Sequence, residues 1–93
     1  MEEITNFIDG GRGKGTSGRF SDVFNPATGE VQAKVPLASK AEVDDAIARA
    51  AVAQVGWGAT NPQRRARVMM KFAALINENM DALADAVSRE HGK

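Results

Sequence analysis

The glycine-rich segment 13–18 is the part of this chain whose spacing could bind a cofactor. Gly13, Gly15 and Gly18 satisfy the pattern G-x-G-x-x-G, in which backbone amides approach the pyrophosphate of a dinucleotide. That chemistry needs a helix that opens directly after the glycines, because the helix N-terminus holds the phosphates. A strand-like segment follows instead, and Gly15 stands where a phosphate loop would carry Ser or Thr. We therefore expect an exposed hairpin loop and no cofactor-binding residue here.

A cluster of positive charge lies at the start of a predicted helix, where the helix dipole disfavours it. Its members are Arg64, Arg65, Arg67 and Lys71. One interpretation is a contact with an anion or with nucleic acid; the other is a solvated face with ion pairs to acids on the preceding helix. The chain has 12 basic and 12 acidic residues, and no aromatic residues interleave with the cluster for base stacking. We expect the solvated, ion-paired face and no nucleic-acid partner.

The remaining reactive side chains do not form a catalytic set. The chain has no cysteine, which excludes a thiolate nucleophile, a disulfide and a sulfur-ligated metal. His91 is the only histidine and lies at a helix end with too few neighbouring ligands for a metal site. The helical acids fall on polar faces, where they suit pairing at i and i+4: Asp44, Asp45, Glu78, Asp81, Asp85 and Glu90. The prediction is that no catalytic, cofactor-binding or metal-binding residue is present.

Large apolar side chains outside the strands have a packing interpretation. Met69, Met70 and Met80 lie on or beside an apolar helix stripe and are expected to fill a core. Trp57 stands between two glycines and is expected to anchor the turn between two helices, with a ligand platform as the alternative.

Length and composition bound the fold. With 93 residues the chain forms one small domain with a scant core. The first ten residues, MEEITNFIDG, carry two glutamates and no long apolar run, so they do not resemble a secretory signal. No window approaches the roughly 18 apolar residues of a membrane span. The expected compartment is the cytoplasm, with no membrane partner.

Residues 1–38 are predicted to form short antiparallel strands, a hairpin plus a third strand. Ile4, Phe7 and Ile8 precede the reversal at 9–11, and residues 12–18 hold no apolar side chain. Residues 20–24 give the second strand, 25–29 a turn set by Asn25, Pro26 and Gly29, and 30–35 alternate polar and apolar residues as the third.

Residues 39–93 are predicted to form two helices, the second long. Ser39 and Glu42 fit a capping box, and Gly56 and Gly58 are expected to end the first helix. Asn61-Pro62 is a second start signal. An apolar stripe then repeats by threes and fours through Val68, Phe72, Leu75, Ile76, Met80, Leu83 and Val87, to the end of the helix at Glu90.

The second helix is expected to be longer than the domain that contains it. Residues 61–90 would span roughly 45 Å at 1.5 Å per residue, against an expected radius of gyration of roughly 12 Å for 93 residues. Part of the stripe should therefore lack a partner within this chain. Either the chain associates with itself or more protein packs on top of it.

Three linked segments resemble the N-terminal segment of the aldehyde dehydrogenase superfamily. They are residues 7–10 (FIDG), residues 24–31 (FNPATGEV), and the helix pair with Trp57, Arg64-Arg65-Ala66 and the closing Glu90-His91-Gly92-Lys93. Two further stretches, 16–20 and 57–65, look most like the CoA-acylating methylmalonate-semialdehyde dehydrogenases.

The resemblance implies NAD-dependent oxidation of an aldehyde through a cysteine thioester that passes to coenzyme A. In family sequences the catalytic cysteine, the glutamate base and the nicotinamide-binding motif lie further along. The resemblance therefore implies a single partial domain over 1–93, a non-catalytic layer of the cofactor domain. NAD and coenzyme A would be cofactors of the family, with none expected for this chain. The implied partner is the remainder of a dehydrogenase or a homo-oligomer. The alternative is a small interaction protein that self-associates through the apolar face of residues 61–90.

Overall fold

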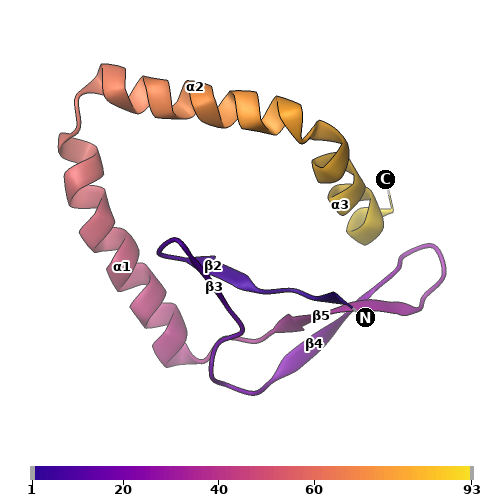
Figure 1. Ribbon diagram of the computed structural model, residues 1–93. Coiled ribbons are helices and arrows are strands. Elements are labelled where there is room, and N and C mark those ends of the chain that lie inside the picture. Colours follow the sequence, from indigo (N-terminus) through magenta and orange to yellow (C-terminus); the bar gives the residue numbers. More distant parts are fainter. Residues whose placement is uncertain (1, 93) are drawn as a thin grey trace.

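The computed structural model describes residues 2–92, in which two small sheets precede three helices (Figure 1). The strands are β1 (Glu2–Glu3), β2 (Asn6–Ile8), β3 (Gly11–Gly13), β4 (Phe20–Phe24) and β5 (Val31–Pro36). The helices are α1 (Lys40–Ala59), α2 (Pro62–Glu78) and α3 (Met80–His91). The α+β class and the order of strands before helices agree with the sequence prediction, but there are three helices where two were predicted.

The larger sheet has the order β1-β5-β4 and is built on the turn between β4 and β5. Asn25 Oδ1 accepts a hydrogen bond from the Ala27 amide at 2.8 Å, and Gly29 has a φ of +76° with its amide bonded to Asn25 O at 2.8 Å. This confirms the predicted turn at residues 25–29. It brings β4 antiparallel to β5 with Phe20 opposite Pro36.

Two features of the strands differ from the prediction. Gly11–Gly13, expected to be part of an exposed loop, forms a strand that pairs with β2 across the reversal at Asp9-Gly10. Asp9 and Gly10 have φ values of +54° and +74°, as a two-residue hairpin turn with a right-handed strand twist requires. In addition, β1 pairs parallel with β5, placing Glu2 opposite Ala33, so the sheet is mixed rather than antiparallel.

The helix starts follow the predicted caps. The Ser39 amide donates to Glu42 Oε1 at 3.1 Å while the Glu42 amide donates to Ser39 Oγ at 3.2 Å, which is the complete capping box. Asn61 Oδ1 accepts from the Gln63 amide at 2.8 Å, and Pro62 takes the first helical position. Both helices therefore begin with one of their free amides satisfied by a side chain.

The helix ends are where the prediction was wrong. α1 continues through Gly56 and Gly58 to Ala59, because an interior glycine weakens a helix by only about 1 kcal/mol without ending it. The predicted helix 61–90 is two helices that meet at Asn79, whose φ and ψ are −112° and 20°. The Asn79 backbone amide still makes the helical bond to Leu75 O, while the side-chain Nδ2 also donates to Leu75 O at 2.8 Å; the non-helical φ and ψ of Asn79 end α2. Figure 1 shows α3 turning sharply from the axis of α2.

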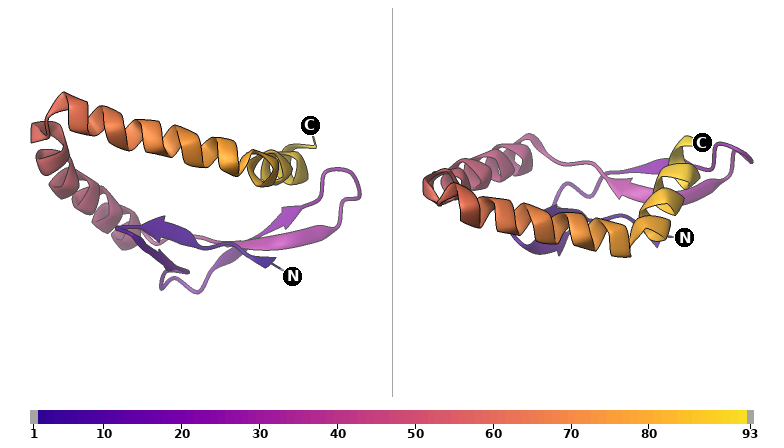
Figure 2. Two further views of the ribbon diagram at one scale, coloured as in Figure 1. Left: turned by 45° about the horizontal axis from the view of Figure 1, so that its top comes forward. Right: turned by 90° about the horizontal axis from the view of Figure 1, so that it is seen from above.

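The chain is open and nearly coreless. Its radius of gyration is 16.8 Å, well above the roughly 12 Å of a compact chain of this length, and its extents are 48 × 35 × 17 Å. Figure 2 shows the helices as an arc that faces the strands in a thin, flat body. Among residues 2–92 only Ala33 and Pro36 are classed as buried, and both lie on β5, the central strand. The described residues thus form a frame around a very small core.

Candidate interaction site on the helices

The glycine loop is positioned by α1 and not by a helix of its own. Gly15 and Gly18 have φ values of +73° and +71°, β4 follows them, and the next helix begins only at Lys40. The Glu42 carboxylate lies against Gly15, so a Cβ built there would be 2.9 Å from Glu42 Cδ. A carboxylate in this place repels a pyrophosphate. The residues present therefore do not fit a dinucleotide.

Glu42 joins the loop to the first turn of α1. Hydrogen bonds from the Ser39 backbone, and then from Thr16, lower the pKa of Glu42 below its ordinary value because they stabilise the ionised carboxylate. The N-terminal end of the helix favours the same negative charge. The three residues therefore tie the loop 14–19 to the helix cap.

Arg49 joins the β2–β3 hairpin to the middle of α1. Its Nε donates to Asp45 and its Nη1 to Asp9, each at 2.8 Å. The two carboxylates raise the pKa of Arg49, Asp45 having the larger effect. All three side chains are more than half exposed, so the network fixes geometry more than it stabilises. A depression of about 380 Å³ lies beside it, lined with charges of both signs including Arg12 and Asp45.

The far end of the helical arc is held against the sheet by Arg89 and Gly92. Gln32 Nε2 donates to Arg89 O at 2.6 Å, and the Arg89 guanidinium pairs with Asp85 at 3.1 Å and Glu2 at 3.4 Å. Gly92 has a φ of +78°, and a Cβ there would be 3.1 Å from Pro26 Cγ. α3 is thereby attached to both β5 and the turn at 25–29.

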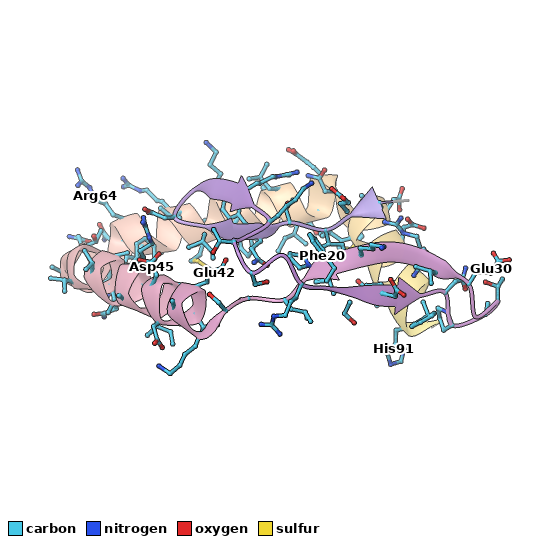
Figure 3. All side chains as sticks on the ribbon, turned by 90° about the horizontal axis from the view of Figure 1, so that it is seen from below. Phe20, Glu30, Glu42, Asp45, Arg64 and His91 are labelled. Carbon is cyan, nitrogen blue, oxygen red and sulfur yellow. The ribbon has the colours of Figure 1, made fainter. Side chains whose placement is uncertain are left out.

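Three of the six helical acids pair as predicted, and the basic cluster does not. Lys40 pairs with Asp44, Arg49 with Asp45 and Arg89 with Asp85, all at i and i+4. Within residues 2–92 no ion pair involves the basic cluster of α2 (Arg64, Arg65, Arg67 and Lys71), because the acids of α1 lie at 42–45, at the opposite end of that helix from α2. The predicted ion pairs to the first helix are therefore wrong. Figure 3 shows Glu42 and Asp45 close together on α1, with Arg64 and His91 at distant ends of the molecule.

Other predicted residues are exposed in this chain. His91 is exposed at the end of α3, as expected. Met69, Met70 and Met80, expected in a core, are 53%, 70% and 48% exposed, because the described residues provide no core for them. Trp57 lies inside α1 and is 42% exposed, rather than in a turn between helices. No group of three or more metal-ligating side chains is found in the part of the chain described.

The feature left for function is the apolar stripe of α2 and α3. No residue of α2 is buried, and Val68, Phe72 and Leu75 are 53%, 53% and 47% exposed. On α3, Met80, Leu83 and Val87 continue the stripe at 48%, 45% and 59%. Large apolar side chains exposed in a row along a helix are typical of a surface that contacts other protein. Within residues 2–92 no helix is long and apolar enough to cross a membrane.

Comparisons with known proteins relate the chain to a family of larger enzymes. The model of the family described as "Aldehyde dehydrogenase family" matches residues 14–93. The malonate-semialdehyde dehydrogenase of Halalkalibacterium halodurans is 42% identical over 99% of this chain, and malonate-semialdehyde dehydrogenase 3 of Geobacillus kaustophilus is 46% identical over 97%. Each match spans 19% of the relative.

A solved structure is similar over nearly the whole chain. It is a protein from Sinorhizobium meliloti assigned as a methylmalonate-semialdehyde dehydrogenase and complexed with NAD, with 60% identity and a TM-score of 0.91. The similarity covers 98% of this chain and 18% of that one. The chain thus spans about a fifth of the length of these relatives. The alternative of a small self-associating interaction protein finds no support in them.

Proposed function

Because this chain belongs to the aldehyde dehydrogenase family, we propose that it serves as a structural segment of the cofactor domain of a CoA-acylating malonate- or methylmalonate-semialdehyde dehydrogenase. The complete enzyme would oxidise the semialdehyde with NAD and transfer the acyl group to coenzyme A. In this proposal residues 1–93 are one partial domain, catalytically inactive alone, whose partner is the remainder of the dehydrogenase. The proposed compartment is the cytoplasm, and homo-oligomers of complete subunits belong to the same proposal.

The observation that carries the proposal is the exposed apolar stripe on a backbone that matches a dehydrogenase. A TM-score of 0.91 at 60% identity means that the open frame is similar to a part of a larger enzyme. In the chain itself, α2 has no buried residue. A surface that covers α2 and α3 would remove these side chains from water, at roughly 25 cal/mol for each Å² of apolar area.

The test is a chimera in which residues 1–93 replace the matching part of the Sinorhizobium meliloti protein. We expect the chimera to form NADH from methylmalonate semialdehyde, NAD and coenzyme A. The isolated chain should form none, because it carries no cysteine to make the thioester. In the same chimera, Phe72→Asp places a charge in the stripe and should abolish soluble, active enzyme. The matched control is Met70→Asp, at a position 70% exposed, which should be tolerated better.

Two results would refute the proposal. Turnover by the isolated chain with NAD and coenzyme A would show that the chain is not merely structural. An inactive chimera, alongside an active enzyme that keeps its own segment, would show that the frame cannot replace the part it resembles. Analytical ultracentrifugation of the active chimera tests the oligomer separately.

A further inference from the structure

We propose that Arg65 makes a buried ion pair with a carboxylate on the protein surface that covers α2 in the assembled dehydrogenase. This proposal rests on the proposed function above, and it specifies what the covering surface must carry. The surface would be apolar except for one aspartate or glutamate opposite Arg65.

The first observation is the position of Arg65 on the helix. Arg65, Val68, Phe72 and Ile76 follow one another at spacings of three, four and four residues, so they share one face of α2. Arg64 and Lys71 border the other edge of the stripe, at i−4 and i+3 from Val68, and Arg67 lies on the far side of the helix from Arg65. Arg65 is thus the cation aligned with Phe72 and Ile76. Whatever covers the stripe also covers this guanidinium.

The second observation is that Arg65 is already partly withdrawn from water. In α2 only Arg65 and Ile76 are half-buried, and the other residues are exposed. These two lie on the same face, three turns apart. The Arg65 Nε atom is shielded from solvent and has no hydrogen-bond partner among the described residues. An N–H group left unpaired in this way is unfavourable, and more so when it carries charge. Arginine cannot reduce this cost by losing its proton.

The third observation is that the chain does not supply the missing carboxylate. No aspartate or glutamate occurs between Asp45 and Glu78, and Glu78 shares the face of Arg67 and Lys71 rather than the stripe. Packing the α2 stripe of one copy against the α2 stripe of another would therefore bury both Arg65 side chains without a counter-charge. A second copy seated in this way fits the charge pattern worse than a surface that carries an acid. The family match makes the remainder of the dehydrogenase the occupant to which we commit.

The covering carboxylate would satisfy the Nε and one Nη donor together. A bidentate arginine–carboxylate pair uses this edge of the guanidinium and fixes the register of α2 on the surface beneath it. Removing one partner of a buried pair is strongly destabilising, because the other charge is left buried and unpaired.

The experiment compares three variants of the active chimera: Arg65→Met, Arg65→Lys and Arg67→Met. The readout is the thermal midpoint together with the half-life of activity at a fixed raised temperature. Arg65→Met should lower the midpoint by about 3–5 °C, at about 1 °C for each kcal/mol in an enzyme about five times as long as this chain. Arg65→Lys keeps the charge and should recover part of that loss. Arg67→Met lies on the far side of the helix from Arg65 and should change the midpoint by no more than about 0.5 °C.

The order of the two Arg65 variants decides the proposal even if both are poorly folded. If the covering surface carries a carboxylate, lysine is better than methionine. If the covering surface is wholly apolar, methionine is equal to lysine or better, and the proposal is overturned. An inactive chimera with the wild-type chain refutes the proposed function and this inference with it, whereas an active chimera that tolerates Arg65→Met refutes the inference alone.

Discussion

Replacing Gly15 by alanine probes how the loop and the first helix depend on each other. The new Cβ would be 2.9 Å from Glu42 Cδ and 3.1 Å from Oε1, inside the 3.4 Å of ordinary contact. Glu42 cannot move away freely, because its carboxylate accepts from the Ser39 amide at 3.1 Å and is also bonded by Thr16. The substitution therefore combines an unfavourable backbone conformation with the loss of a capping box.

Two other glycines separate these two effects. Gly18 has a φ of +71° and nothing within 4 Å of its would-be Cβ, so Gly18→Ala carries the backbone cost alone, about 1 kcal/mol. Gly13 has no positive φ and also meets nothing within 4 Å, so Gly13→Ala should be close to neutral. In the chimera, which is about five times as long as this chain, these values correspond to a fall of about 1 °C for Gly18→Ala and a smaller one for Gly13→Ala. Gly15→Ala should fall roughly twice as far as Gly18→Ala, since it has the same backbone cost and the displaced carboxylate in addition.

A double-mutant cycle with Glu42→Ala tests the reason for the larger effect. Once the carboxylate is gone, Gly15→Ala should cost no more than Gly18→Ala. The assay is the thermal midpoint of each chimera, measured at one scan rate. If the effects of Gly15→Ala and Glu42→Ala simply add, the contact between loop and helix is not what makes Gly15 necessary.

Three further predictions concern the same frame. Ser39→Ala removes the hydroxyl that accepts from the Glu42 amide and should destabilise the chimera by about 1 kcal/mol, measured as a fall in its thermal midpoint, with Ser21→Ala on an exposed strand as the control. The pKa of Glu42 is lowered below its ordinary 4.5, so its stabilising contribution is complete above that pH and is lost as the pH falls through the folded value. NMR titration of the Glu42 carboxyl carbon should give a midpoint below 4.5, and a midpoint at or above it would contradict the hydrogen bonds. Gly92→Ala would place a side chain on a residue with a φ of +78° and 3.1 Å from Pro26 Cγ, so hydrogen exchange of the backbone amides in α3 should become faster. Unchanged protection of these amides would mean that α3 is held by Arg89 and Gln32 alone.

The features predicted correctly depend on neighbours within a few residues. Ser39 and Glu42 make their capping box across three residues, and Asn25 and Gly29 make their turn across four. In each case the physical cause and its partner lie in the same short window. The sequence pattern could therefore identify both the element and the contact that stabilises it.

The features that were missed depend on distant or graded causes. The parallel pairing of Glu2 with Ala33 joins segments some thirty residues apart, which no local pattern encodes. The break at Asn79 is invisible to periodicity, because Ile76, Met80 and Leu83 keep the same spacing across it. Gly56 does not end α1, because the destabilisation of a helix by one interior glycine is small beside the hydrogen bonds of a 20-residue helix.

The candidate site was only half predictable. That residues 61–90 would present an uncovered apolar stripe followed from helix length alone, and α2 is indeed without a buried residue. Spacing alone does not separate Arg65 from Arg64, because both are within four residues of Val68 on the helix. The unpaired Nε needed coordinates.

The break at Asn79 has a consequence for the order in which the frame forms. Because α3 turns back to the sheet, Glu2 and Arg89 meet across 87 residues, and Gln32 bonds Arg89 across 57. Contacts that close such long loops form late in folding, and an exposed ion pair adds little to hold them. The hairpins and α1 should therefore fold first, with α3 the last element to dock and the first to detach. Enclosure of α2 by a covering surface would be coupled to that final docking, so the chain reaches its stable form during assembly rather than before it.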